Sequence, residues 1–209
     1  MLDLYSGAGG AGMGYHRAGF EVTGVDISPQ PNYPFTFVQM DAIEFLNGNG
    51  HEFDAVHASP PCQTYSKMTN CRPGLAAEYP DLIDATRQAL ITASKPWVIE
   101  NVEGSPLKNP IFLCGKMFGR QLYRHRLFES SFQLPQPQHP EHDLPASKAG
   151  HWTPGTTMSV CGHVSPIKIA RELMDIGWTT RDELGESIPP YFTEWIGGLM
   201  QHEINRKEH

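Results

Sequence analysis

The residue of this chain best suited to nucleophilic chemistry is a cysteine that follows two prolines. Cys62 comes directly after Pro60 and Pro61, and the apolar run over residues 53–57 before them predicts a buried strand. Because proline fixes φ and opposes helix, we expect Cys62 on a stiff loop at the carboxyl end of that strand, where open α/β sheets bind ligands. With no Asp or Glu from residue 59 to 74, the thiolate is favoured. The alternative is an inert, buried thiol.

A carboxyl group is predicted at the same edge of the sheet. Residues 97–99 are typical of a short buried strand, and Glu100 follows them directly. If this strand runs parallel to the one before Cys62, their carboxyl ends meet and Glu100 lies near the thiol. A carboxyl group in apolar surroundings stays protonated near neutral pH and can donate a proton. An ion pair with a nearby arginine is the equally open alternative.

Two arginines stand two residues apart in a further predicted strand. Arg124 and Arg126 belong to the run over residues 122–132, and alternate residues of a strand point to the same side. Such a pair suits the binding of a polar ligand or a phosphate. A solvated edge strand would carry the same pattern, so both interpretations stay open.

The N-terminal residues have the pattern of a cofactor loop. A short strand over residues 2–5 meets a glycine-rich turn over residues 6–12, and a helix is expected after it. Glycines let the backbone approach a ligand closely, and the helix N-terminus offers free N–H groups to it. Gly7, Gly9 and Gly12 also match the dinucleotide pattern G-x-G-x-x-G, which by itself has low specificity.

Two aspartates follow the next predicted strands. Asp26 ends the strand over residues 21–26, where a carboxylate can accept hydrogen bonds from a ribose. We therefore expect a cofactor that carries a ribose, with a helix or turn cap as the alternative role. Asp41 follows the strand over residues 35–38, and it either meets an adenine amino group or caps the helix that begins at Ala42.

Length and composition are those of an ordinary soluble domain. The chain has 209 residues, of which 39% are hydrophobic and 19% are charged, so it suits one domain with an ample core. No apolar run approaches the ~20 residues that span a bilayer, and no basic-then-apolar leader begins the chain. The four scattered cysteines indicate reduced thiols and a cytoplasmic protein, which we expect to be a monomer.

The total charge argues against a nucleic-acid partner, whereas the distribution of charge is compatible with one. The formal net charge is -7, and phosphate contacts usually need a basic face. One stretch without Asp or Glu nevertheless offers a local basic surface. Its cations are Lys108, Lys116, Arg120, Arg124 and Arg126.

The rest of the chain divides into helices and one irregular segment. Helices are expected over residues 81–94, 167–174 and 191 to about 204, the first as a crossover between two parallel strands. Prolines and turn residues make residues 129–163 a loop or a small irregular subdomain. Without C-x-x-C or H-x-x-x-H spacing we assign no metal site there. The histidines and cysteine of this segment are His139, His142, His151, Cys161 and His163.

These blocks, in this order, resemble the cytosine-C5 methyltransferases. Asp3-Leu4-Tyr5-Ser6-Gly7-Ala8-Gly9-Gly10 is similar to the family's S-adenosylmethionine loop, and Pro60-Pro61-Cys62-Gln63 to its catalytic motif. Glu100-Asn101-Val102 matches the Glu-Asn-Val motif, and Arg124-x-Arg126 resembles the Gln-x-Arg-x-Arg motif. Gly185-x-Ser187-x-Pro189-Pro190 is similar to the last motif, Gly-Asn-Ser-Val-Pro-Pro. Five motifs in the family's order, from residue 2 to about 200, form a specific signal.

The resemblance implies a Rossmann-like α/β fold and a methyltransferase that acts on cytosine in DNA with S-adenosyl-L-methionine. Cys62 would attack C6 of the base while Glu100 protonates N3. Arg126 would hold O2 of the base, and Arg124 would steady the catalytic loop. The base must leave the stack, so duplex DNA requires base flipping. The residues implied for the cofactor site are Tyr5, Ser6, Gly7, Ala8, Gly9, Gly10, Asp26, Ile27, Asp41, Ala42, Pro60, Glu186 and Ser187.

The chain departs from the family pattern at several positions. Tyr5 stands where Phe is usual, and Leu122 and Glu186 replace the Gln and the Asn of their motifs. Ser59 replaces a usual Gly, and Ser-Pro-Pro-Cys also resembles the tRNA-methylating branch. We expect residues 1–128 and 166–209 to form the catalytic domain and residues 129–165 a short Pro-rich recognition segment. Because this segment is much shorter than usual, we expect weak sequence specificity or a more accessible substrate, such as single strands or RNA.

Three other functions fit parts of the sequence. An RNA cytosine-C5 methyltransferase acting on tRNA is the nearest. A catalytically silent module that binds nucleic acid or cofactor would explain the short recognition segment and the negative net charge. An oxidoreductase that uses the glycine loop would leave Cys62 and Glu100 unexplained.

Overall fold

The computed structural model describes residues 1–61, 82–148, 151–160 and 164–207. The predicted nucleophile, Cys62, lies outside these ranges, as do Cys161 and His163 of the irregular segment.

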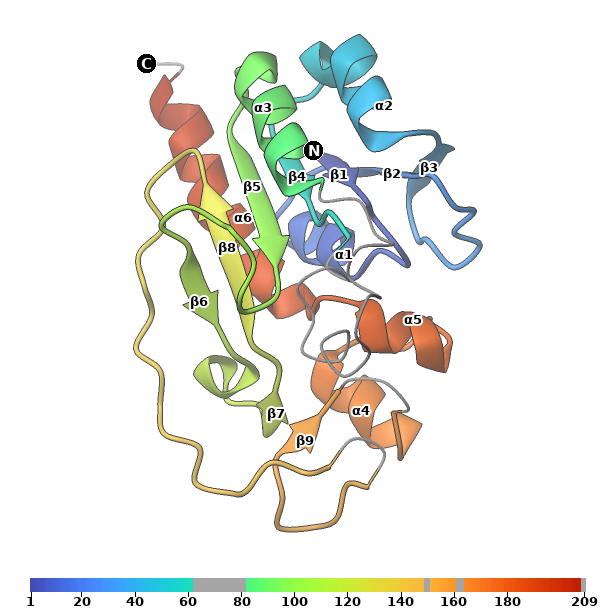
Figure 1. Ribbon diagram of the computed structural model, residues 1–209, viewed down its shortest axis with the longest axis vertical. Coiled ribbons are helices and arrows are strands. Elements are labelled where there is room, and N and C mark those ends of the chain that lie inside the picture. The colour runs from blue at the N-terminus through green and yellow to red at the C-terminus, as the bar shows by residue number, and fades with distance from the viewer. Residues whose placement is uncertain (62–81, 149–150, 161–163, 208–209) are drawn as a thin grey trace.

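A seven-stranded sheet forms the centre of the molecule (Figure 1). Its order is β3-β2-β1-β4-β5-β8-β6, in which the first five strands are parallel and β8 runs antiparallel to both neighbours. This order confirms the Rossmann-like α/β class and the parallel pairing of the two strands that lead to Cys62 and Glu100. The strands are β1 (Leu2–Leu4), β2 (Thr23–Asp26), β3 (Thr36–Gln39), β4 (Val56–Ala58), β5 (Trp97–Asn101), β6 (Ile111–Leu113) and β8 (Arg126–Ser130).

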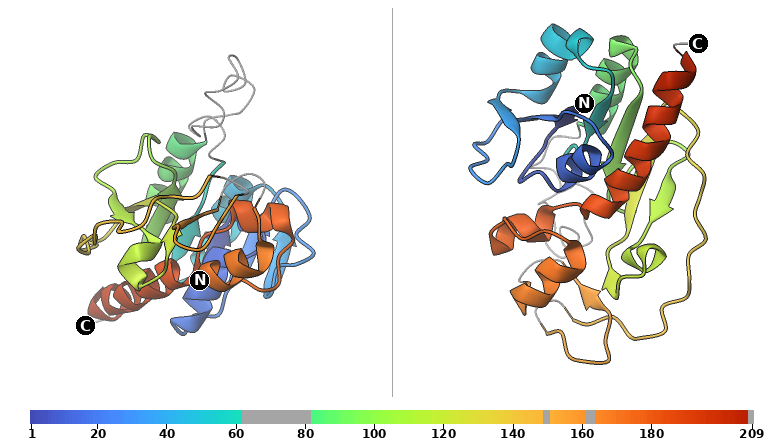
Figure 2. Two further views of the ribbon diagram at one scale, coloured as in Figure 1. Left: turned by 90° about the horizontal axis from the view of Figure 1, so that it is seen from below. Right: turned by 180° about the vertical axis from the view of Figure 1, so that it is seen from behind.

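Helices cover both faces of the sheet (Figure 2). α1 and α6 lie on one face, where Tyr15 and Phe192 belong to one buried apolar cluster. α2 and α3 lie on the other face, and a second cluster there includes Leu46 and Leu90. Parallel strands need both faces covered, because their side chains alternate between the two. The helices are α1 (Gly10–Arg17), α2 (Ala42–Asn49), α3 (Ile83–Ala93) and α6 (Pro190–Lys207).

A glycine lets α1 and α6 pack closely. A Cβ on Gly14 would stand 2.1 Å from both Pro190 O and Thr193 Oγ1, so no other residue fits there without movement of the backbone. Thr193 donates the same hydroxyl to Ala11 O at 2.8 Å. The C-terminal helix is thereby fixed against the helix that follows the glycine loop, and the last motif comes to lie beside that loop.

A smaller layer lies below the sheet in Figure 1. β7 (Leu122–Tyr123) pairs in parallel with β9 (Met158–Ser159), next to α4 (Ile167–Met174) and α5 (Arg181–Glu186). A third apolar cluster joins these elements and contains Leu122, Met158, Val160, Val164, Ala170, Met174, Ile176 and Leu184. Short 3-10 helices occur at η1 (Gly50–Glu52) and η4 (Gly115–Phe118). No helix in the described ranges combines enough length with enough apolar character to cross a bilayer.

The predicted elements are mostly confirmed, and the differences have local causes. α4 has the predicted bounds. The apolar pattern does not predict α5, although its start carries a helix signal, the capping box between Thr180 and Glu183. The single strand expected over residues 122–132 is two strands, β7 and β8, because the chain leaves the strand conformation at Arg124 and His125.

The buried carboxyl group of Asp3 makes stability depend on pH. Burial raises the pKa of Asp3 from its usual 3.8 to about 8, although Tyr33 donates a hydrogen bond to it at 3.1 Å. Between these two values the folded chain keeps a proton that the unfolded chain loses, so stability is full below about pH 4 and falls toward pH 8. The slope is at most about 1.4 kcal/mol per pH unit for one proton.

We therefore expect Asp3→Asn, which is neutral at every pH, to flatten this dependence. Urea denaturation of both proteins at pH 5 and pH 8 measures it. If the stability of both proteins changed equally between pH 5 and pH 8, the Asp3 carboxyl group would already be ionised in the folded chain at pH 5.

Candidate active site

The sheet reverses its direction of growth at β1, and this point defines a ligand-binding edge. From β1 the chain moves outward to β2 and β3, then returns to the other side of β1 with β4. The loops after β1 and β4 leave in opposite directions, and open α/β sheets bind ligands in the crevice between such loops. The first of these loops is the glycine loop, and the second leads to Cys62.

The glycine loop has a backbone suited to a ligand. Tyr5, Gly7 and Gly9 have φ angles of 55°, 48° and 83°, in the left-handed region that favours glycine. A Cβ on Gly7 would have no described atom within 4 Å, so the backbone there faces open space. Ser6 Oγ is buried without a hydrogen-bond partner among the described residues. A bound polar ligand would satisfy such a hydroxyl and the free N–H groups at the start of α1.

Three side chains follow β2 and β3 at this edge. Asp26 accepts hydrogen bonds from Gly7 N at 3.0 Å and Ser28 N at 2.9 Å, so it fixes the glycine loop and its own turn. Ile27 is 70% exposed, the highest value among large apolar side chains in the described ranges. Asp41 caps α2 by accepting from two N–H groups of its first turn. Capping is thus observed for both aspartates, and a carboxylate has further lone pairs for a ligand.

The last motif packs against the glycine loop. A Cβ on Gly10 would stand 2.4 Å from Ile188 O, so the two backbones approach closely. Burial and nearby carboxylates, Asp26 among them, raise the pKa of Glu186. Ser187 is buried beside it. The segments predicted to hold the cofactor therefore meet at one edge of the sheet.

Tyr5 departs from the usual Phe, and its hydroxyl has a partner. Tyr5 OH lies 2.8 Å from Thr86 Oγ1, which belongs to α3. The extra oxygen of Tyr5 thus ties the glycine loop to the crossover helix.

Glu100 is a buried carboxyl group in β5 that pairs with Arg126. The residue is 6% exposed, and Arg126 Nε lies 2.9 Å from Glu100 Oε1. Burial raises the pKa of Glu100, and the positive charges of Arg126 and Arg124 with the Ser59 hydroxyl partly oppose that rise. A carboxyl group with a raised pKa keeps its proton to higher pH and can serve as an acid. The predicted arginine partner is therefore confirmed, and the role of Glu100 as an acid stays a prediction with which its raised pKa is compatible.

The chain that enters the catalytic loop is fixed next to Glu100. Asn101 Nδ2 donates to Pro60 O at 3.0 Å, so the end of β5 holds the backbone two residues before Cys62. Cys62 itself lies outside the described residues. The motif residue Asn101 thus joins the strand of the predicted acid to the strand of the predicted nucleophile.

A buried polar chain below this edge is missed by the sequence reasoning. His57 Nδ1 lies 3.0 Å from Tyr15 OH, and His57 Nε2 lies 2.9 Å from Ser59 Oγ. Burial lowers the pKa of His57 to about 3, so the ring stays neutral and positions the Ser59 hydroxyl. The sequence does contain a signal for this chain of contacts, a histidine inside an apolar run. A polar side chain buried there needs hydrogen-bond partners.

Arg124 binds the backbone of two distant segments, whereas Arg126 pairs with Glu100. The Arg124 guanidinium donates to Val160 O at 2.5 Å and to Ser187 O at 2.6 Å, and the residue is 3% exposed. Arg124 therefore fastens the end of the irregular segment and the last motif to the end of β7. The two arginines do not form the ligand clamp that their spacing predicts, because the strand breaks between them.

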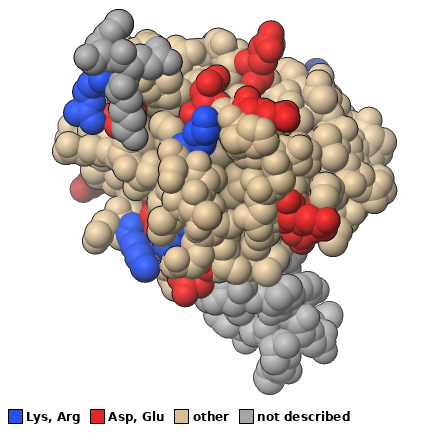
Figure 3. Space-filling view, turned by 90° about the horizontal axis from the view of Figure 1, so that it is seen from above, with Lys and Arg blue, Asp and Glu red and all other residues tan. Residues whose placement is uncertain are grey.

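The basic stretch over residues 108–126 does not form one exposed surface. Arg124 is buried, Arg126 faces Glu100, and Lys116 pairs with Asp143. At the opposite end of the molecule, where α2, α3 and the C-terminus lie, Lys and Arg also appear as separate spots among Asp and Glu (Figure 3). Three of the five cations therefore have partners within the described structure and do not contribute to the expected basic surface.

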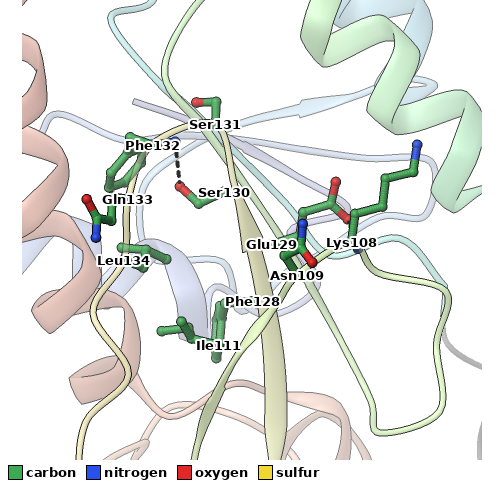
Figure 4. Close-up of a pocket in the computed structure, with 10 residues that line it drawn as sticks. All are labelled: Lys108, Asn109, Ile111, Phe128, Glu129, Ser130, Ser131, Phe132, Gln133 and Leu134. Atoms are coloured by element: carbon green, nitrogen blue, oxygen red, sulfur yellow. Dashed lines mark hydrogen bonds between the residues drawn. The ribbon is translucent and has the colours of Figure 1, made fainter.

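A pocket of about 440 Å³ lies away from this site (Figure 4). Its walls come largely from residues 128–134, which run from the middle of β8 away from Arg126, and from Lys108 and Asn109. None of the predicted catalytic or cofactor residues lines it. We therefore give this pocket no part in the candidate active site.

The comparisons with known proteins agree with this geometry. The chain is 29% identical over 173 residues to the Type II methyltransferase M.AquIA of Picosynechococcus sp., covering 65% of this chain and 67% of that protein. It is 30% identical over 79 residues to the Type II methyltransferase M.FnuDI of Fusobacterium nucleatum, covering 34% of this chain and 23% of the relative. No family model matches.

Solved structures match over nearly the whole chain. The Dnmt2 methyltransferase of S. pombe has a TM-score of 0.61 at 14% identity, with 98% of each chain covered. The Entamoeba histolytica methyltransferase EhMeth has a TM-score of 0.63 at 12% identity, with 97% of this chain and 98% of that one covered. A putative DNA modification methyltransferase from an E. coli prophage has a TM-score of 0.59 at 14% identity, with 98% and 99% covered.

Strand order and these matches show the Rossmann-like fold of methyltransferases that use S-adenosyl-L-methionine, with the glycine loop at its switch point. The residues present fit that cofactor, because the loop has an open backbone, an unsatisfied Ser6 hydroxyl and an exposed apolar side chain at Ile27. In the five motifs and their order, and in its two curated relatives, the chain is similar to the cytosine-C5 methyltransferases.

Proposed function

We propose that this chain methylates C5 of cytosine in DNA through a covalent adduct between Cys62 and the base. The observation that carries the proposal is the buried, arginine-paired Glu100 beside the backbone that leads to Cys62. An acid and a nucleophile on adjacent parallel strands are the two groups that this addition chemistry needs.

The reaction assigns distinct tasks to Cys62, Glu100 and Arg126. The Cys62 thiolate adds to C6 of the cytosine, and the electron pair of the C5–C6 double bond moves toward N3, which takes a proton from Glu100. When bound, S-adenosyl-L-methionine supplies the methyl group to the C5 carbon that this addition makes nucleophilic. Loss of the C5 proton to solvent, departure of the thiolate and return of the N3 proton to Glu100 then restore the aromatic ring and the acid. Arg126, paired with Glu100, orients that carboxyl group and contacts O2 of the base.

We further propose a division of the chain between catalysis and recognition. Residues 1–128 and 166–209 form the catalytic, cofactor-binding domain, and residues 129–165 form the recognition segment. Arg124 supports this division, because its bonds to Val160 O and Ser187 O connect the end of that segment to the last motif. We expect Arg124 to position the segment relative to the active site, and Arg126 to act at the base.

The cofactor residues are proposed from their places around the glycine loop. Asp26 suits the ribose, Asp41 and Ala42 suit the adenine, and exposed Ile27 suits the apolar face of the adenine ring. Tyr5, Ser6, Gly7, Ala8, Gly9 and Gly10 line the loop, while Pro60, Glu186 and Ser187 close the site from the neighbouring segments.

Ile27→Ala tests the cofactor assignment without disturbing the fold. Because Ile27 is 70% exposed, its truncation should leave stability unchanged while removing apolar contact with the adenine. We expect the dissociation constant for S-adenosyl-L-methionine to rise about 5- to 30-fold, as for loss of most of one buried aliphatic side chain. Calorimetric titration measures it, with Ile91→Ala, 52% exposed on α3, as the matched control. Equal affinities in both variants would contradict the assignment.

The reaction itself is tested by bisulfite sequencing of DNA treated with enzyme and cofactor. Protected cytosines should appear with the native chain and disappear with Cys62→Ala. A duplex containing 5-fluorocytosine should give a covalent adduct at Cys62, because the fluorine blocks loss of the C5 proton. Identical bisulfite conversion with the native chain and with Cys62→Ala would rule out activity on the DNA used.

An RNA substrate is the second candidate, favoured by the short recognition segment and by Ser59 before Pro60. Few side chains of residues 129–165 can read base edges, so a base outside a duplex is easier to use. Transfer of labelled methyl groups to tRNA and to DNA in parallel reactions separates the two substrates. Label in tRNA alone would replace the DNA proposal with the RNA one.

A further inference from the structure

Four side chains that can bind a metal gather beside the arginine motif. Cys114 follows β6, His125 lies between β7 and β8, and His139 and His142 come from the coil after β8. One ligand atom of each lies within 4.8 Å of those of the other three. We propose that these side chains, the Cys114 cluster, bind one Zn²⁺ that fastens the recognition segment to the catalytic domain.

The spacing of the ligand atoms fits a tetrahedral ion. His125 Nε2 and His142 Nε2 are 3.4 Å apart, and Cys114 Sγ is 3.5 Å from His142 Nε2. With Zn–N and Zn–S bonds of about 2.05 and 2.3 Å, a tetrahedron places two nitrogens about 3.3 Å apart and a sulfur about 3.6 Å from a nitrogen. The separations of His142 Nε2 from His125 Nε2 and from Cys114 Sγ are therefore already those of a zinc site.

The fourth ligand has a nitrogen without a partner. His139 Nε2 is buried and makes no hydrogen bond to another described atom. The facing Nε2 atoms of His125 and His142 add a second difficulty, since two ring nitrogens can share only one proton. A cation between the rings would use all of these lone pairs at once. Histidines that merely packed as aromatic rings would leave this need unmet.

The surroundings hold the rings in place. Glu103 Oε2 lies 3.5 Å from His125 Nδ1, the nitrogen that faces away from the cluster, as in carboxylate–histidine–zinc arrangements. Phe112 contacts the rings of His125 and His139, with centroids 4.7 and 5.2 Å apart. Tyr123 stacks on His125 at 4.2 Å. A carboxylate partner and aromatic walls are the outer shell that orients metal-binding histidines.

The ligand set indicates zinc in a structural role. One thiolate and three imidazoles supply four protein ligands of nitrogen and sulfur, which closes the tetrahedron and leaves no open position for catalysis. The residues around His139 and His142 form a coil with few backbone ladders, tied to β6 by hydrogen bonds between the Gln136 amide and Phe112 (Figure 1). A metal is an efficient clamp for such a segment. Since His125 stands between Arg124 and Arg126, the same ion would fix both arginines.

Metal content and affinity of the full chain test this site directly. After removal of metal with a chelator, the native chain should take up one Zn²⁺. Competition with a chromophoric chelator then measures the affinity for zinc. Co²⁺ in its place should give the absorption of tetrahedral cobalt with a thiolate band. His139→Gln and Cys114→Ser should each lower zinc affinity at least about 100-fold, more than loss of an outer-shell partner does. His151→Gln, an exposed histidine of the same segment outside the cluster, should bind like the native chain.

Circular dichroism shows whether each variant is folded. If the variant of buried Cys114 unfolds, His139→Gln still tests the site, because His139 is less buried. A folded His139→Gln chain that binds zinc as tightly as the native chain would overturn the proposal. So would a native chain that takes up no zinc after chelator treatment.

Discussion

Glu100→Gln is expected to lower the rate of methyl transfer by about 100- to 10,000-fold, the usual worth of a positioned acid. The amide keeps the shape of the side chain and its place beside Arg126, but it cannot deliver a proton to N3. Glu100 is buried beside Arg126, next to the segment that leads to Cys62. Single-turnover transfer of labelled methyl groups measures the loss, with binding of DNA as the control that should stay within a few fold.

The dependence of rate on pH separates an acid from a merely structural carboxyl group. Burial raises the pKa of Glu100, so its acid form persists to higher pH and is lost as the pH passes that pKa. The native rate should therefore fall on the alkaline side, and Glu100→Gln should show no such fall, while the rise due to the Cys62 thiolate remains in both. An alkaline fall of equal size in the variant would contradict the role of Glu100 as acid.

The sequence predicts most of the sheet and the order of the motifs because both depend on local patterns. Short apolar runs bounded by glycine, proline or acidic residues mark the parallel strands, and α4 is found with its predicted bounds. Parallel pairing then brings Glu100 to the strand end before Cys62, as a topological consequence. An acid role and an arginine partner are equally open for Glu100 from sequence alone, and only the three-dimensional contact shows that the partner is present.

Long-range polar contacts could not be predicted in this way. Arg124 bonds to carbonyl groups 36 and 63 residues away, and a spacing of two residues from Arg126 holds no information about either partner. The Cys114 cluster is a similar case, since its ligands are spread over residues 114–142 without a recognised metal spacing. Such contacts depend on how loops fold back over the sheet, which periodicity does not record.

Glu129→Leu is expected to destabilise the fold by about 3 kcal/mol, because buried Arg87 loses its bidentate partner and keeps only exposed Asp84 and the carbonyl group of Pro106. The side chains of Arg87 and Glu129 are 3% and 5% exposed, and they form two parallel hydrogen bonds of 2.7 and 2.9 Å. The same carboxylate accepts a bond from Lys108 N at 2.7 Å. The pair thus joins α3, β8 and the loop before β6, and the midpoint of urea denaturation measures its loss.

The double variant Arg87→Met/Glu129→Leu determines whether the cost comes from the unpaired charge. With both charges gone, apolar side chains can pack between α3 and β8, and buried ion pairs replaced in this way are often neutral in stability. Recovery should be incomplete, because Lys108 N then lacks its acceptor. We expect the double variant to be more stable than Glu129→Leu by at least about 1 kcal/mol, a coupling that pairs in contact show. A single-variant loss below about 1 kcal/mol, as for an exposed ion pair, would mean that water reaches this contact.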